Sequence, residues 1–97
     1  MQTISKEISG TITVTENSTF HNVNLQSITV EENIVARLYG MVEGTMYVKQ
    51  GSVVYLHGKL AGKIISDGGI VYVFKPNGQV ESFGPTDSYQ ENSISHL

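Results

Sequence analysis

Residues 23–76 consist of three lines of eighteen residues, VNLQSITVEENIVARLYG, MVEGTMYVKQGSVVYLHG and KLAGKIISDGGIVYVFKP. The lines align without a gap, so that Ile28, Met46 and Ile64, for example, share one position in the repeat. A fixed repeat of this length is typical of a solenoid, in which each unit buries its apolar face by stacking on the next. This stretch therefore decides the architecture of the chain.

Each unit contains two segments with the composition of β-strands. The first alternates apolar and polar residues, as in residues 45–49, and the second is rich in β-branched and aromatic residues, as in residues 53–57. A turn separates them, and a short third segment such as 42–44 leads into the next unit. The strands are too short to pair within one unit. The repeat predicts an all-β fold, a short three-faced β-solenoid of about four 18-residue coils whose strands pair between coils.

Stacking turns each repeat position into a column of side chains, and the apolar columns are expected to face inward. A small antiparallel barrel or sandwich is the alternative, because short strands with glycine turns are usual there too. It leaves the regular spacing unexplained. The predicted inward columns are Ile12, Ile28, Met46 and Ile64; Val14, Val30 and Val48; Leu38, Leu56 and Phe74; and Val42 with Leu60.

The 97 residues suffice for a single domain. Residues 1–22 are expected to form an N-terminal cap and an imperfect first coil, because residues 10–14 match residues 44–48. The segment from Ile4 to Ile8 is expected to lie over the open end of the stack. The coils then occupy 23–83, with Ser82 and Phe83 closing a last partial coil, and 84–97 form a polar tail or cap.

Composition excludes several classes of function. Six basic residues against nine acidic ones argue against binding nucleic acid by phosphate neutralisation. The chain has no cysteine, which excludes disulfides, thiolate metal sites and cysteine nucleophiles. The first residues lack a secretory-signal pattern, and no apolar run approaches the ~20 residues that span a bilayer. We expect a soluble, cytoplasmic protein without a cofactor.

No motif predicts catalysis or metal binding. The three histidines have no metal-ligand spacing, adjacent carboxylates at 31–32 point to opposite faces of a strand end, and the glycine pair at 68–69 lacks the lysine and helix of a phosphate-binding loop. A hexapeptide-repeat acyltransferase would need a catalytic histidine such as His57, flanked by Tyr39 and Lys75, but the six-residue repeat is not kept. The histidines are His21, His57 and His96. We predict a protein that is not an enzyme.

The outward side of the second strand is unusually apolar and aromatic for a solvated surface. Tyrosine and arginine are enriched in binding surfaces, so this side is the candidate protein-binding site. Alternatively, the tyrosines only stabilise their own sheet. Three valines, at 35, 53 and 71, are expected to face outward unless a bulge turns them in. The candidate binding residues are Arg37, Tyr39, Tyr55, His57, Val73 and Lys75.

The runs Gly40-Met-Val-Glu-Gly44 and Gly58-Lys-Leu-Ala-Gly62 share one motif, a glycine, an apolar residue two places later and a second glycine two beyond that. Over about residues 37–83 the chain resembles the bactofilins, a bacterial family that forms polymers. The resemblance implies a right-handed β-helix that associates end to end without nucleotide or metal. The third copy has Pro76 and Val80 in place of the two glycines, which predicts that the repeat stops there.

Two kinds of protein partner follow from these observations. The first is another copy of the chain or a different protein that docks on the outward face around Arg37 and Tyr55. The second is a basic toxin, because a small, acidic, cysteine-free chain is typical of the immunity proteins that neutralise such toxins. Neither hypothesis involves nucleic acid or a membrane.

Overall fold

The computed structural model describes residues 1–84, and this part of the chain is built from eight β-strands. No helix in it is long and apolar enough to cross a membrane. The strands are β1 (Gln2–Ile4), β2 (Ile8–Val14), β3 (Ser18–Val30), β4 (Val35–Val48), β5 (Val53–Leu60), β6 (Lys63–Ser66), β7 (Ile70–Phe74) and β8 (Val80–Phe83).

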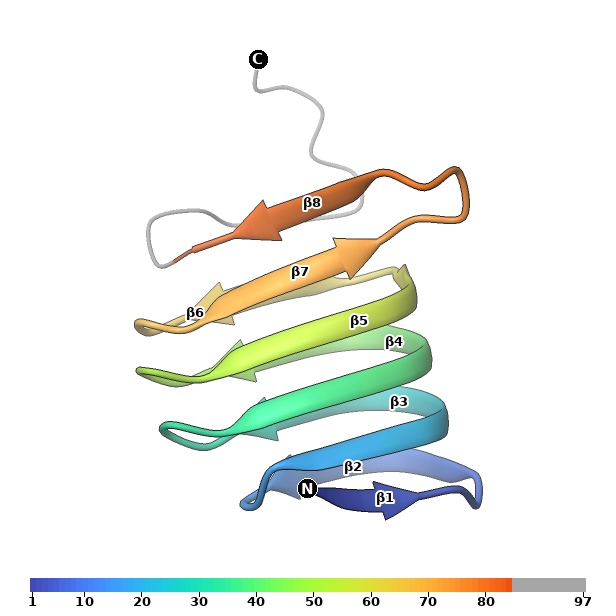
Figure 1. Ribbon diagram of the computed structural model, residues 1–97, viewed down its shortest axis with the longest axis horizontal. Coiled ribbons are helices and arrows are strands. Elements are labelled where there is room, and N and C mark those ends of the chain that lie inside the picture. The colour runs from blue at the N-terminus through green and yellow to red at the C-terminus, as the bar shows by residue number, and fades with distance from the viewer. Residues whose placement is uncertain (85–97) are drawn as a thin grey trace.

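The chain coils upward, and each coil pairs in parallel with the next, as in β3 with β4 and β4 with β5. With the N-terminus below, it crosses the front from left to right, returns at the rear and rises, so the coil is right-handed (Figure 1). The register from Val35↔Val53 to Val42↔Leu60 is the predicted spacing of eighteen residues. The β-solenoid is therefore confirmed, and parallel pairing excludes the antiparallel barrel.

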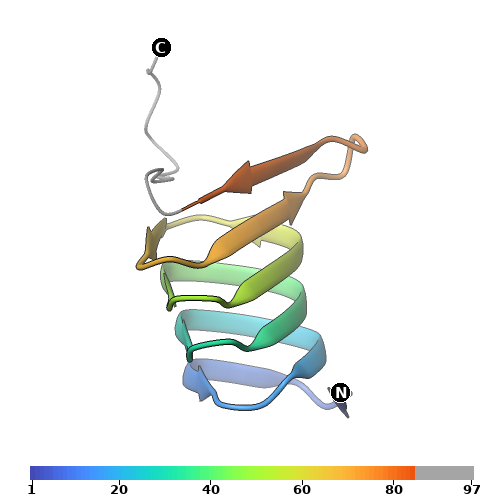
Figure 2. The same ribbon diagram turned by 60° about the vertical axis from the view of Figure 1, so that its left-hand side comes forward.

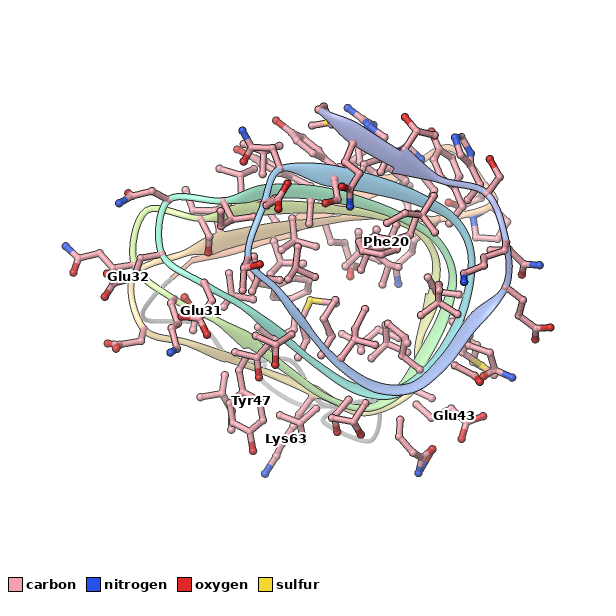
Figure 3. The ribbon with its side chains drawn as sticks, turned by 90° about the horizontal axis from the view of Figure 1, so that it is seen from below. Phe20, Glu31, Glu32, Glu43, Tyr47 and Lys63 are labelled. Atoms are coloured by element: carbon pink, nitrogen blue, oxygen red, sulfur yellow. The ribbon has the colours of Figure 1, made fainter. Side chains whose placement is uncertain are left out.

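In cross-section each coil is a flattened loop (Figure 3). We call residues 2–4, 18–20, 35–39, 53–57, 70–74 and 80–83 the front sheet and residues 11–14, 27–30, 45–48 and 63–66 the rear sheet. A corner joins front to rear, as at 40–42, and a turn joins rear to front, as at 49–52. The short third segment of the repeat is this corner, where the strand bends without a break.

The core lies between the two sheets and consists of stacked columns. Ile28, Met46 and Ile64 are buried one above another, with Ile12 partly buried at the lower end. Phe20, which points into the interior in Figure 3, extends the column of Leu38 downward. The other columns that the repeat predicted and the structure confirms are Val14, Val30 and Val48, and Val42 with Leu60; Leu25 lies below Val42.

The last coil departs from the eighteen-residue spacing. Four residues connect β4 to β5, whereas only the three residues 67–69 connect β6 to β7. The register of the front sheet therefore shifts to seventeen residues, with Tyr55↔Tyr72 and Leu56↔Val73. Because successive side chains of a strand point to opposite faces, a shift of one residue exchanges the two faces. The prediction that Phe74 faces inward is wrong: Val73 takes that position and is 6% exposed.

Both ends of the stack also differ from expectation. The first residues do not lie over the open end, because β1 pairs with β3 in the front sheet. Residues 80–83 do not close a parallel coil: β8 turns back and pairs antiparallel with β7. This hairpin extends beyond the corner of the coils below (Figure 2). The expected C-terminal tail or cap lies, from residue 85 on, outside the described residues.

Candidate functional site

The outward side of the front sheet carries most of the predicted binding residues, and we call it the front face. It contains three columns that run along the stack. Arg37, Tyr39, Tyr55 and His57 all lie on it, half-buried against one another. The columns are Val35, Val53 and Ile70; Thr19, Arg37, Tyr55 and Tyr72; and His21, Tyr39, His57 and Phe74.

The third of these, the ring column, is a continuous stack of four rings. Ring centroids are 5.4 Å apart from His21 to Tyr39, 4.5 Å from Tyr39 to His57 and 4.2 Å from His57 to Phe74. The interplanar angles of 10–13° mean that the rings face one another along the solenoid axis. The stack thus occupies ring faces that would otherwise be free for a sugar or a base.

Arg37 joins the ring column to its neighbour. Its guanidinium carbon lies 4.6 Å from the centroid of the Tyr55 ring, a cation–π contact, and Nη1 lies 2.8 Å from Nε2 of His57. A guanidinium can only donate, so Nε2 of His57 accepts this hydrogen bond and its ring is neutral, with the proton on Nδ1. Above Arg37, Tyr55 stacks on Tyr72 at 5.4 Å. These contacts join the ring column to the column of Arg37, Tyr55 and Tyr72.

Two predicted residues lie elsewhere. Val73 is buried in the core because of the shorter turn before β7. Lys75 was expected to continue the column of Tyr39 and His57, but Phe74 occupies that position and Lys75 follows it at the start of the hairpin. There Nζ of Lys75 lies 3.4 Å from Oε1 of Glu81.

Sequence reasoning missed three rings of the face, and also Ile70, which occupies the place expected for Val71. Phe74 was assigned to the core by the same one-residue error, and Tyr72 was not among the candidate binding residues. A signal for them existed, because aligning Tyr55 with Tyr72 gives a column of aromatics. His21 was missed because the aligned units were begun at Val23, although His21 lies eighteen residues before Tyr39 and the same spacing places it in this column. Of the three valines, Val35 and Val53 are half-buried on the outward side, whereas Val71 is fully buried.

The front face carries no carboxylate among its described outward residues. Arg37, His21 and His57 are its polar groups with basic character, and Ile70 and Val80 near its upper end are exposed apolar side chains. The outward residues of the rear sheet are mostly threonine and serine, with Tyr47 and Lys63 pointing away from it in Figure 3. The front face is therefore more aromatic and apolar than the outward side of the rear sheet.

Burial of the imidazole, and secondly the charge of Arg37, lower the pKa of His57 below its ordinary value of 6.5. The unfolded chain then takes up a proton at a higher pH than the folded chain does. Stability is therefore expected to fall as the pH drops through 6.5 and to level off below the folded-state pKa.

This pH dependence is isolated by comparison with His57→Phe, which keeps a ring in the stack and removes the titrating group. Urea denaturation of both proteins between pH 7.5 and 5.5 measures it. We expect the wild type to lose stability relative to the variant as the pH falls. A stability difference that does not change with pH would contradict the proposed contact between neutral His57 and Arg37.

The remaining candidate groups form no site within residues 1–84. No three His, Asp or Glu side chains in this range are placed to hold a metal ion together. Glu31 bonds to Lys49 one coil above at 3.0 Å, and Glu32 projects from the turn in Figure 3. His96 lies outside the described residues. His57 lies between two rings with Nε2 bound to Arg37, so that nitrogen is not free to act as a base.

No protein-family model, curated protein or solved structure matches this chain.

Proposed function

We propose that this chain is a non-enzymatic protein-binding module that docks through its front face. The observation that supports this proposal is the continuous run of aromatic, arginine and apolar side chains along the front face, whereas the outward side of the rear sheet is mostly threonine and serine and carries Tyr47, Lys63 and Ile65 only near its upper end. Aromatic residues and arginine dominate the energy of protein interfaces. The stacking contacts of Tyr39, Tyr55 and His57 already fix their rotamers, so binding costs little side-chain entropy.

The partner that fits this face is flat, apolar and neutral or acidic. Arg37 would be repelled by a basic partner, and no described outward residue of the face offers a carboxylate to compensate. A basic toxin would instead need the turns that carry Glu16, Glu31 and Glu32. The front face therefore favours a partner other than a basic toxin.

A second copy of the chain fits this description only where its acidic turns meet the front face, because two front faces would bring their Arg37 side chains together. End-to-end stacking of coils, as in the bactofilins, needs a parallel edge at both ends of the solenoid. The antiparallel strand β8 occupies the front half of the upper end. We therefore place self-association on the front face, and light scattering from micromolar to millimolar concentration measures it.

The experiment that tests the proposal places the photo-cross-linking residue p-benzoylphenylalanine at Tyr72 in the cell that makes the protein. A matched variant carries it at Thr13, on the rear sheet. We expect a cross-linked adduct of one defined mass from position 72, its loss when Arg37→Glu is added, and no such adduct from position 13. Equal cross-linking from both positions, or none from position 72, would exclude the front face as a docking surface.

A further inference from the structure

The upper edge of the rear sheet is one strand short of the front sheet. In the front sheet, β7 and β8 continue above β5. In the rear sheet, β6 pairs with β4 below it, and no strand of residues 1–84 pairs with β6 from above. The two sheets therefore end at different heights, with a step between them (Figure 1). An unpaired edge is a template for another strand.

The backbone of β6 is oriented for such pairing. The amide of Asp67 donates to the carbonyl oxygen of Val48 in the coil below, and the amide of Ala61 donates likewise to Val42. Alternate amides of a strand point to opposite sides. The amides of Ile64 and Ser66 thus point toward the open edge.

The side chains along this edge define what it would accept. Ile65 and Tyr47, neighbours on the outward side, are 42% and 43% exposed. Lys59, at the corner before β6, and Lys63, in β6, are both exposed. Neither forms an ion pair within the described residues. At the corner that precedes β6, a cavity of about 500 Å³ lies between the end of β5 and the hairpin, lined by Gly40, Gly58, Lys59, Leu60, Val73, Lys75 and Pro76.

We propose that this edge binds an extended, acidic segment of another protein as an added β-strand. The backbone of the segment would pair with Ile64 and Ser66, its carboxylates would face Lys59 and Lys63, and an apolar side chain would enter the cavity. Lys75, which also lines the cavity, is already paired with Glu81. This site is separate from the front face and does not depend on it.

Because the two sheets end at different heights, the β6 edge can pair with a single strand but not with a second solenoid. A second solenoid seated on β6 would meet the hairpin of β7 and β8, which rises above the rear edge. One extended segment fits beside the hairpin because strands in a sheet lie only about 4.8 Å apart.

The probe for this site is a nine-residue peptide of alternating valine and glutamate with blocked ends. It is titrated into the full-length, 15N-labelled protein and followed by amide chemical shifts. We expect the shift changes to concentrate at residues 59–66 and to be absent when lysine replaces glutamate in the peptide. The variant Lys63→Glu should weaken binding about twofold to fivefold, the value of one exposed ion pair. Lys6→Glu, with the same net charge, should bind as the wild type does.

Three results would overturn the proposal. The first is slow hydrogen exchange of the Ile64 and Ser66 amides in the free full-length protein, because the edge would then already be paired by the chain itself. The second is equal binding of the glutamate and lysine peptides, because the edge would then have no preference for an acidic segment. The third is the absence of any shift at residues 59–66.

Discussion

Replacing Leu56 with aspartate is expected to abolish the folded state at room temperature. Leu56 is 0% exposed and lies between Leu38 below and Val73 above. The substitution removes about 2–3 kcal/mol of apolar burial and places a carboxylate where no described polar side chain can pair with it. A domain of this size has a free energy of unfolding of only about 5–15 kcal/mol. The substitution also disrupts the packing of this coil on both the coil below and the coil above. Circular dichroism should show the loss of the strand signal and of cooperative melting.

The matched control is Val53→Asp on the same strand. Val53 is half-buried on the outward side, in the column of Val35 and Ile70, so its carboxylate reaches water. We expect the melting temperature to fall by a few degrees at most. If Val53→Asp unfolds the protein as Leu56→Asp does, the assignment of the two sides of β5 is wrong.

The sequence was sufficient to predict the solenoid because residues at the same position of successive repeats point to the same side of the sheet. Ile28, Met46 and Ile64 differ in shape but occupy equivalent places, and their spacing alone identified the inward column. Handedness was not derivable from the spacing, which is the same for both hands; only the resemblance to bactofilins implied it.

The error at β7 has a physical cause. Residues 70–74 read Ile-Val-Tyr-Val-Phe, which is apolar on both sides of the strand, so alternation does not choose the inward one. The length of the preceding turn decides which side of β7 faces inward. This turn has three residues, 67–69, whereas the turn between β4 and β5 has four. Consequently Val73 moved from the predicted binding site into the core, and Phe74 moved out to stack on His57.

The hairpin at the upper end was predictable in part. Pro76, Asn77 and Gly78 have turn chemistry, and Gly78 adopts a φ of 90°, which favours glycine. Sequence reasoning took Pro76 as the end of the repeat but not as the start of an antiparallel strand. The contact of Arg37 with both Tyr55 and His57 depends on rotamers across two coils, which spacing does not specify.

The glycines that recur at the corner have a steric explanation. A Cβ added at Gly62 would overlap the carbonyl oxygen of Gly44 one coil below, and one at Gly44 would overlap that of Gln26. The same holds for Gly58, whose added Cβ would overlap the carbonyl oxygen of Gly40. Successive coils therefore approach each other closely at the corner, and the glycine motif follows from this backbone contact.

Gly62→Ala is accordingly expected to destabilise the fold by about 3 kcal/mol, because the methyl group can be accommodated only by moving the backbone of two coils apart. Gly10→Ala is the matched control. Nothing lies within 4 Å of a Cβ at Gly10, and its φ of 89° alone opposes alanine, which costs about 1–2 kcal/mol. Urea denaturation of the two variants separates the steric cost from the conformational one. If Gly62→Ala is no less stable than Gly10→Ala, the coils do not meet at the corner as closely as the stacked glycines require.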